Sequence, residues 1–287
     1  MANISNKAQQ MPASAIRKLV PFADAAKKEG VKVYHLNLGQ PDIKSPACAL
    51  EAIKNYSKEN ISYSHSAGLM ELRQGLVEKY YKNIGIDITV DELIVTVAGS
   101  ESVNLALEIA CDPGDEVLVL EPFYTNYNTF AFMNELTLKA IPTDIRKGFQ
   151  IPDIEEFEKA ITPKTKAILI CNPGNPTGTQ YSKESMLALG EIARKHDLFL
   201  LSDEVYREFC YTDEPHFSAM NIPGLEQNVI LIDSVSKRYN LCGARIGCIV
   251  SHNKDVMTAA MKFAQARLCS PVLGQYAAIG ALDTPES

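Results

Sequence analysis

The chain has 287 residues, of which 46% are hydrophobic and 22% charged, and its 28 basic and 35 acidic side chains give a net charge of −7 at pH 7. This apolar content is enough for a folded core and excludes wholesale disorder, while the acidic balance argues against a nucleic-acid-binding face. Apolar stretches such as 117–120 and 167–171 are too short to span a bilayer, so we expect a soluble, cytoplasmic α/β protein of one large domain or two unequal ones.

The first fifty residues differ in composition from the rest of the chain. The opening segment MANISNKAQQMP is polar and lacks the apolar stretch of a secretory signal. The first fifty residues contain four prolines at positions 12, 21, 41 and 46, with one helical stretch at 14–30 and a short apolar run at 33–38 before Gly39. This composition predicts an N-terminal arm that packs on another surface and does not form a strand of the main sheet.

From residue 70 onward, amphipathic segments alternate with short apolar runs. Each run is about five residues long, as expected of strands that are covered on both faces. The predicted strands are 93–97, 116–120, 136–141, 166–171, 198–202, 229–233 and 246–250. The predicted helices are 70–83, 101–111, 154–161, 183–196 and 253–268. This alternation predicts an α/β fold with a mostly parallel seven-stranded sheet and helices on both faces.

The cysteines and histidines give no indication of a metal site. Seven cysteines occur without a C-x-x-C pair, and the five histidines are scattered without zinc-binding spacing. Most of the cysteines lie inside apolar runs, which favours buried and unreactive thiols. We therefore expect no bound metal.

Polar residues follow four of the predicted strands, and in open parallel sheets ligands bind beyond the carboxyl ends of the strands. After the first of these, Gly99 and Ser100 open a helix whose free amides can hold a phosphate, although an ordinary N-cap by Ser100 is the alternative. After the fourth predicted strand, two prolines and two glycines in 171–178 hold Asn175 in a rigid loop. After the fifth, Asp203 precedes Tyr206 by about one helical turn, and here too a helix N-cap is the alternative.

The sixth predicted strand leads into a lysine with hydroxyl neighbours. Lys237 follows Ser234 and Ser236, and Arg245 comes eight residues later. Such a lysine serves either as a phosphate clamp or as a Schiff-base nucleophile, since nearby positive charge lowers the pKa of an amine. Arg245 could supply that charge and grip a phosphate. Taken singly, Lys237 would be a solvated surface lysine, but four such features at four strand ends predict a binding site.

Three motifs occur in a family-specific order. They are N-P-G-N-P-T-G at 172–178, S-D-E-V-Y at 202–206 and S-V-S-K-R-Y-N-L-C-G-A-R-I-G at 234–247. In this order they resemble the class I aminotransferases of the aspartate aminotransferase superfamily, which are fold-type I enzymes that use pyridoxal 5′-phosphate (PLP). The resemblance covers essentially the whole chain, including L-N-L-G-Q-P-D near residue 40.

The resemblance implies roles around the cofactor ring. Lys237 would bind PLP covalently and later move the proton between Cα and C4′. Asp203 would keep the pyridine nitrogen protonated, so that the ring can act as an electron sink. Asn175 and Tyr206 would hydrogen-bond the 3-oxygen of the ring, and Tyr124 would stack on its face.

The resemblance also implies a phosphate subsite, a substrate contact and a partner subunit. Gly39 would lie at the substrate carboxylate, and Tyr63 would reach the phosphate bound by the other subunit of a homodimer. The phosphate would be held by Gly99, Ser100, Ser234 and Arg245, with Ser236 as a helper.

The activity implied by the resemblance is ping-pong amino transfer between an L-amino acid, with aspartate as the best-guess donor, and a 2-oxo acid. PLP-dependent carbon–sulfur lyases and decarboxylases stay open as alternatives, because Lys237 and Asp203 do not fix which Cα bond breaks. A non-catalytic PLP-binding domain is the alternative outside the enzymes, although no basic DNA-binding segment accompanies it.

The resemblance implies two unequal parts. Residues 1–46 would form the N-terminal arm with part of a small domain, and residues 47–287 the large PLP-binding domain. The C-terminal remainder of the small domain, with the arginine that binds the substrate α-carboxylate, is expected to be absent, because no arginine follows Arg267. We expect a protein of these residues alone to bind PLP and to transaminate poorly.

Overall fold

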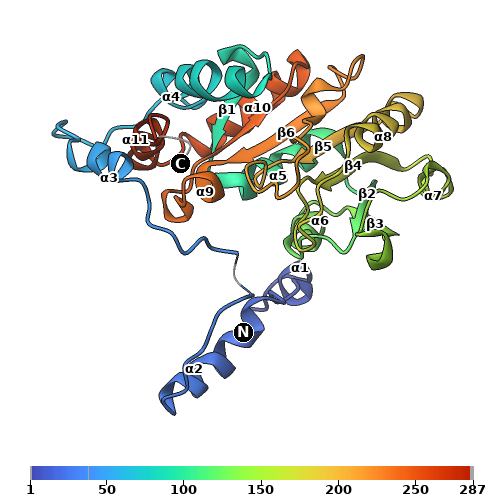
Figure 1. The fold of residues 1–287 in the computed structure, drawn as a ribbon, viewed down its shortest axis with the longest axis horizontal. Helices are drawn as coiled ribbons and strands as arrows, with labels where there is room; N and C mark the ends of the chain where they lie inside the picture. The colour runs from blue at the N-terminus through green and yellow to red at the C-terminus, as the bar shows by residue number, and fades with distance from the viewer. Residues whose placement is uncertain (1, 38, 285–287) are drawn as a thin grey trace.

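The computed structural model describes residues 2–37 and 39–284, and Figure 1 shows a layered α/β body with a projecting N-terminal arm. The strands are β1 (Leu93–Thr96), β2 (Glu116–Glu121), β3 (Thr137–Pro142), β4 (Thr165–Cys171), β5 (Phe199–Asp203), β6 (Val229–Ser234) and β7 (Gly247–Val250). The helices are α1 (Asn6–Gln10), α2 (Val20–Lys28), α3 (Ala47–Lys54), α4 (Met70–Gly75), α5 (Ala98–Ala110), α6 (Asn126–Met133), α7 (Ile154–Ala160), α8 (Lys183–Lys195), α9 (Val235–Arg238), α10 (Lys254–Arg267) and α11 (Val272–Ala281).

All seven strands join one sheet in the order β1-β7-β6-β5-β4-β2-β3. The five strands from β6 to β3 pair in parallel, and β7 runs antiparallel to both β6 and β1. The predicted mostly parallel seven-stranded sheet is thus confirmed, with β7 as the reversed strand. Every strand boundary lies within one residue of its predicted position.

Helices cover both faces of the sheet, as predicted. Because successive strand residues point to opposite faces, each apolar strand contributes to two cores. Leu118, Ile168 and Leu200 pack with residues of α3, α4, α7, α8 and α11 on one face. Val119 and Leu201 pack with α5, α6 and α10 on the other. A run such as β4 must therefore be apolar throughout, which is why these strands show no polar alternation.

The helices differ from the predicted ones in three respects. The helix predicted at 70–83 is α4 continued by a π-helical turn at 76–81 and a 3₁₀ turn at 82–84. Helix α5 begins at Ala98, three residues before its predicted start. Helices α1, α3, α6, α9 and α11 lie in segments without a predicted helix. None of the described helices has the length and apolar character needed to cross a membrane.

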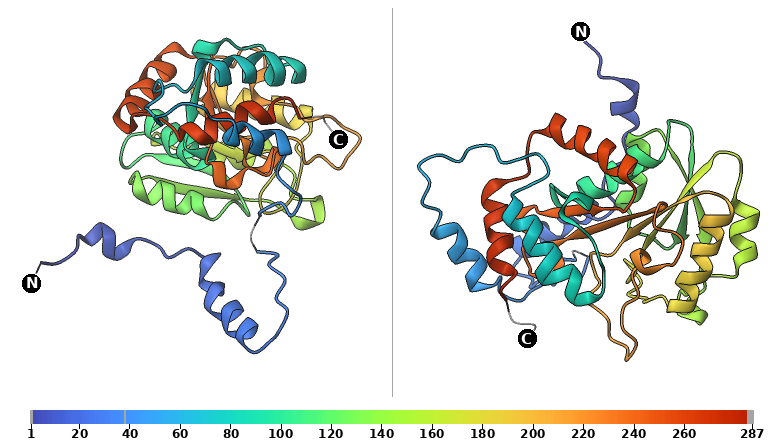
Figure 2. Two further views of the ribbon diagram at one scale, coloured as in Figure 1. Left: turned by 90° about the vertical axis from the view of Figure 1, so that its left-hand side faces the viewer. Right: turned by 90° about the horizontal axis from the view of Figure 1, so that it is seen from above.

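The N-terminal arm lies outside the sheet and its helix layers, as the left view in Figure 2 shows. Of the helix predicted at 14–30, the structure forms a 3₁₀ turn at 17–19 and α2. The apolar run at 33–38 is irregular over its described residues, 33–37, and its last residue lies outside the described residues. Lys7 attaches α1 to the body by donating to the carbonyl oxygen of Met133 at 2.7 Å.

Candidate active site

Four of the strands that precede predicted site residues end at one edge of the sheet. The strands β4, β5 and β6 are mutually parallel, so their carboxyl ends coincide. The direction of β1 is the same, because β1 and β6 are both antiparallel to β7. The topology therefore gathers the residues that follow these four strands, as the sequence predicts.

Asp203 is the buried acid at the end of β5, where only 5% of the residue is exposed. Its side chain points toward the α5–α6 face, where the Tyr127 hydroxyl of α6 donates to Oδ2 at 2.7 Å. Burial raises the pKa of Asp203 to about 6, although the hydrogen bond from Tyr127 opposes this shift. A buried carboxylate with a raised pKa is stabilised by a cation placed beside it, so this position suits a protonated ring nitrogen.

Asn175 and Tyr206 meet across the edge from two different loops. Asn175 Nδ2 donates to the Tyr206 hydroxyl at 3.1 Å, and burial raises the pKa of that phenol. The loop that holds Asn175 is fixed by its own backbone, since Gly174 N donates to the Thr179 carbonyl at 2.8 Å. Tyr206 lies in a turn that follows β5, and not in the helix expected there. An amide and a phenol at this spacing can both bind one oxygen of a ligand.

Lys237 lies in the short helix α9, directly after β6. Its Nζ donates to the Gly39 carbonyl at 2.5 Å and lies 3.9 Å from Cys242 Sγ. The place where a Cβ of Gly39 would stand is 3.5 Å from the Tyr206 hydroxyl. The arm therefore brings Gly39 to the lysine and the tyrosine, as expected of a residue at the substrate position.

Two serines and the first turn of α5 lie close together beside Lys237. Ser234 Oγ caps α9 by accepting from Ser236 N at 3.1 Å and lies 2.8 Å from Ser236 Oγ. A Cβ on Gly99 would lie 3.3 Å from Val205 Cγ1 and 3.7 Å from Ser234 Cβ. Glycine at this position therefore lets the helix start approach β5 and β6 closely.

The N-cap reading of Ser100 is wrong, because Val97 is the N-cap residue of α5 and Ser100 lies inside the first turn. Ala98 has a φ of +61°, a conformation that few residues other than glycine adopt. Gly99 and Ser100 follow in the first turn of α5, where free amides and the positive end of the helix dipole favour an anion. Arg245 is exposed, also has a positive φ of +56°, and donates from Nη1 to the Cys242 carbonyl at 3.0 Å.

Gly247 is a site-forming residue that the sequence analysis does not identify. A Cβ there would lie 2.6 Å from Ala98 C, 2.7 Å from Gly99 N and 2.8 Å from the Asp233 carbonyl, all backbone atoms. We expect Gly247→Ala to push α5 away from β6, because backbone cannot yield as a side chain can. The change should cost about 1–3 kcal/mol of unfolding free energy and weaken PLP binding.

Denaturant melts and PLP titration of the purified protein test the effect of Gly247→Ala. Gly243→Ala is the matched control, because nothing lies within 4 Å of a Cβ at Gly243. Equal stability and equal PLP affinity of the two variants would contradict this account of Gly247.

Aromatic residues line the α6 side of the site. Tyr124 packs edge-on against Tyr127 with ring centroids 5.4 Å apart, and its hydroxyl accepts from Asn126 Nδ2 at 2.8 Å. Burial and the nearby Asp203 carboxylate raise the pKa of the Tyr124 phenol. This position next to the Asp203–Tyr127 pair is consistent with stacking on a planar ligand.

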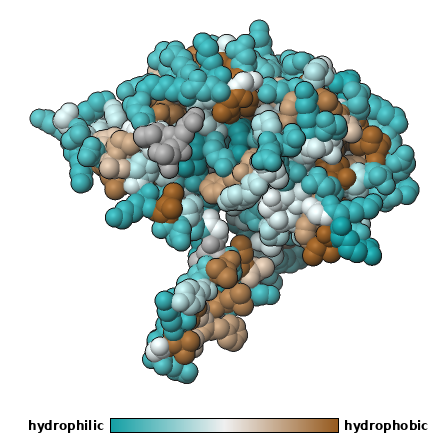
Figure 3. Space-filling model, viewed as in Figure 1, coloured by the Kyte–Doolittle hydropathy of each residue, from teal (hydrophilic) through white to brown (hydrophobic). Residues whose placement is uncertain are grey.

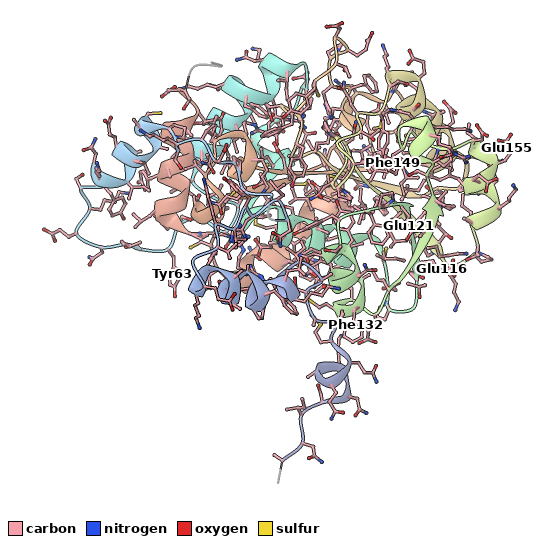
Figure 4. All side chains as sticks on the ribbon, turned by 60° about the horizontal axis from the view of Figure 1, so that its bottom comes forward. Tyr63, Glu116, Glu121, Phe132, Phe149 and Glu155 are labelled. Atoms are coloured by element: carbon pink, nitrogen blue, oxygen red, sulfur yellow. The ribbon has the colours of Figure 1, made fainter. Side chains whose placement is uncertain are left out.

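Tyr63 is the predicted site residue that lies apart from the others. It is 78% exposed, on the segment between α3 and α4, and Figure 4 shows it on the side of the molecule opposite Glu116 and Glu121. Its predicted role requires a second subunit, so that role stays a prediction.

Over residues 2–37 and 39–284, no group of three or more His, Cys, Asp or Glu side chains is placed to hold a metal ion.

The donor set of this edge fits PLP. The cofactor has a pyridine nitrogen, a phenolic oxygen, an aldehyde and a phosphate, and each finds a complementary group. Asp203 suits the nitrogen, the Asn175–Tyr206 pair the oxygen, Lys237 the aldehyde, and the α5 amides with Ser234 the phosphate. The fit rests on residues from four separate segments of the chain, at 99–100, 175, 203–206 and 234–237.

Comparisons with known proteins agree with this geometry. The family profile described as aminotransferase class I and II matches residues 31–287. The aspartate/prephenate aminotransferase of Thermus thermophilus is 32% identical over 100% of this chain and 74% of its own length. The crystal structure of aspartate aminotransferase from Thermotoga maritima is 32% identical and superimposes with a TM-score of 0.92, over 99% of this chain and 75% of that one. The structure of alanine aminotransferase from Pyrococcus furiosus is 33% identical, with a TM-score of 0.90 over 99% and 74%.

Proposed function

The chain belongs to the class I and II aminotransferases, and from this membership we propose that it moves an amino group from an aspartate-like L-amino acid to a 2-oxo acid with Lys237 as the proton-transferring residue. It is a PLP-dependent aminotransferase of fold type I. Aspartate is the proposed donor because the Thermus and Thermotoga relatives carry that amino acid in their names. The observation that carries the residue assignment is the convergence of Lys237, Asp203 and the Asn175–Tyr206 pair at one sheet edge.

Bound PLP supplies an electron sink for the charge that develops at the substrate Cα. Asp203 would hold a proton on the ring nitrogen, because a cation beside the buried carboxylate stabilises its charge. Asn175 and Tyr206 would bind the ring oxygen. Ser234, Ser236 and the amides at the start of α5 would hold the phosphate end.

Lys237 has two tasks in this proposal, anchoring the cofactor and moving a proton. Its Nζ lies at the junction of α9 and Gly39, so an amino acid held near Gly39 would present its Cα proton to this amine. A general base must lie within hydrogen-bonding reach of the proton it takes. The 2.5 Å hydrogen bond from Lys237 Nζ to the Gly39 carbonyl supports the proposal that this amine can reach a substrate held near Gly39.

We further infer a homodimer in which the arm packs on the second subunit. Large apolar side chains are exposed along the arm, among them Leu19, Phe22 and Leu36, and Figure 3 shows apolar residues gathered on this projection. Soluble proteins rarely leave such a patch uncovered. A dimer would also give Tyr63 the partner site that its predicted role requires. Light scattering during size exclusion tests the dimer, and a monomer at micromolar concentration would refute it.

The domain division follows from the same features. We infer that residues 47–287 form the cofactor-binding domain and residues 1–46 the arm with part of a smaller domain. The position of α1 and α2 outside the sheet layers supports this division. The cytoplasmic location predicted from the composition stays a prediction.

A donor screen tests the proposed reaction. The purified protein is loaded with PLP and offered L-aspartate, L-alanine and L-cysteine in turn without an acceptor, and 2-oxoglutarate is added afterwards to complete the transfer. We expect aspartate to give oxaloacetate together with pyridoxamine phosphate. A preference for alanine would instead agree with the donor in the name of the Pyrococcus furiosus relative. Ammonia and pyruvate formed from L-cysteine, with release of sulfide, would indicate elimination and would refute amino transfer.

A further inference from the structure

Four buried charged residues lie beside the candidate site residues in the sequence. Each is the immediate neighbour of a residue that faces the cofactor position, and their side chains are at most 5% exposed. The pairs are Asp203–Glu204, Tyr206–Arg207, Ser234–Asp233 and Lys237–Arg238. We call the four charged residues Glu204, Arg207, Asp233 and Arg238 the charge cluster. It contains two acids and two bases, so its formal charge is zero.

The first half of the charge cluster fixes the turn after β5. Arg207 donates to Glu204 Oε2 from Nη2 at 2.6 Å and from Nε at 3.2 Å. The other oxygen of Glu204 accepts from Ser218 Oγ at 3.0 Å and from Ala219 N at 2.9 Å. Glu204 thus ties the turn that carries Tyr206 to the segment around residue 218, and Arg207 closes the turn by bonding Glu204.

The second half of the charge cluster fixes α9 to the end of β6. Arg238 Nη2 donates to both carboxylate oxygens of Asp233, at 2.7 and 2.8 Å, and Arg238 Nε donates to Glu208 at 2.9 Å. Asp233 Oδ1 also accepts from Ser234 N at 2.7 Å. Although burial alone would raise the pKa of Asp233, the guanidinium groups of Arg238 and Arg207 hold it below its ordinary value.

Tyr80 joins the two halves. Its hydroxyl accepts from Arg207 Nη1 at 2.9 Å, and its ring lies beneath Arg238, with the guanidinium carbon 3.4 Å from the ring centroid. The charge cluster therefore spans from β5 to α9 as one network.

The cluster and the cofactor residues lie on opposite faces of the sheet edge. Successive strand residues point to opposite faces, so Asp203 turns to Tyr127 on the α5–α6 face while Glu204 turns to the face that carries Tyr80. On β6 the order is reversed, and Asp233 joins the cluster while Ser234 faces Ser236 and α5. Movement of a cluster side chain would therefore move the backbone that carries its neighbour.

We propose that the charge cluster positions the cofactor-binding residues from behind, and that Arg238 in particular is a positioning residue for Lys237 and Ser234. This inference rests on the proposed function, because it takes Lys237 and Ser234 as cofactor residues. It goes beyond that function by assigning a task to side chains that touch neither cofactor nor substrate.

Arg238→Lys tests the proposal because it keeps the positive charge and loses the planar fork that grips Asp233 and Glu208. We expect the cofactor-free protein to bind PLP about ten- to a hundredfold more weakly, which is the loss of affinity, about 10–100-fold, typical at metal sites when a group that orients the binding residues is removed. The pH midpoint of the bound cofactor's near-visible absorption band should also shift. Arg146→Lys is the matched control, because exposed Arg146 grips Asp144 through Nε and Nη2 at 3.0 and 2.9 Å outside the site, and it should leave both readouts unchanged.

A second variant separates positioning from stability. Asp233→Asn with Arg238→Gln leaves no buried charge unpaired, so this protein should fold, yet it should retain the weak PLP binding and the shifted midpoint. If either Arg238 variant were less stable but had wild-type affinity and midpoint, the cluster would be merely structural and the proposal would be overturned.

Hydrogen exchange in the cofactor-free protein distinguishes failure of this inference from failure of the proposed function. We expect amides of residues 234–239 to exchange faster in Arg238→Lys than in the wild type. A wild type that takes up no PLP would refute the proposed function, whatever the exchange result. Unchanged exchange at 234–239 would overturn the positioning role by itself.

Discussion

Lys237→Ala should abolish the reducible covalent link between protein and PLP and lower amino transfer by at least about a thousandfold. A positioned acid–base group typically contributes 10²–10⁴-fold, and this substitution also removes the anchoring amine at the Gly39 contact. Borohydride reduction followed by peptide mass spectrometry measures the link. The spectral change on adding L-aspartate to PLP-loaded protein measures the half-reaction.

The control for Lys237 is Lys262→Ala, an exposed lysine on α10, where alanine favours the helix. This variant should keep the covalent label at residue 237 and the wild-type half-reaction. A Lys237→Ala protein that turns over at the normal rate, or a label on a different lysine, would refute the assignment.

Asp203→Asn should lower the rate of amino transfer by about 10²–10³-fold, in the range reported for losing one preorganised electrostatic contact. The amide keeps an oxygen that can accept from Tyr127, but it has no charge to hold a proton on the ring nitrogen. The rate is measured with saturating PLP, so that weaker cofactor binding does not contribute.

The same substitution should stabilise the cofactor-free protein at neutral pH. The pKa of Asp203 rises from 3.8 to about 6 on folding, so the folded state binds the proton more tightly and loses stability as the pH rises through this interval. Two pKa units correspond to up to about 3 kcal/mol at pH 7. Asparagine does not ionise, so the gain should vanish below about pH 4.

Urea melts of cofactor-free protein at pH 4, 5.5 and 7 measure this gain. Asp213→Asn, at an exposed position, should leave unfolding nearly unchanged at all three pH values. Saturating PLP should reduce the advantage of Asp203→Asn, because the ring cation relieves the buried charge of the wild type. An Asp203→Asn protein that is less stable than the wild type at pH 7 would contradict the raised pKa.

The strands were predictable because burial on both faces demands continuous apolar runs, as in β4 and β5. Helix α11 was not, because its sequence VLGQYAAIGA has no polar stripe and contains two glycines. The structure explains both of them: a Cβ on Gly274 would overlap the Ala244 carbonyl, and one on Gly280 would lie 2.6 Å from the Cys48 carbonyl of α3. Close helix–helix packing of this kind depends on a partner that is distant in the sequence.

Site residues inside motifs were predictable, and those that act through tertiary contact were not. Lys237 and Asp203 stand in recognisable patterns at strand ends. Tyr127, which bonds Asp203, lies in the aromatic segment after β2, where the sequence gives no sign of which ring turns inward. Arg238 lies in the lysine motif itself, yet its burial against the Tyr80 ring depends on a segment far away in the chain.

The position of β5 and β6 in the middle of the sheet has a consequence for local unfolding. Central strands open only with the whole domain, whereas termini and loops open at much lower free energy. Asp203 and Ser234 lie at the ends of these two strands, while Gly39 is held by an irregular part of the arm. We therefore expect the arm to detach and return many times during one lifetime of the bound cofactor. Substrates could then exchange without release of PLP.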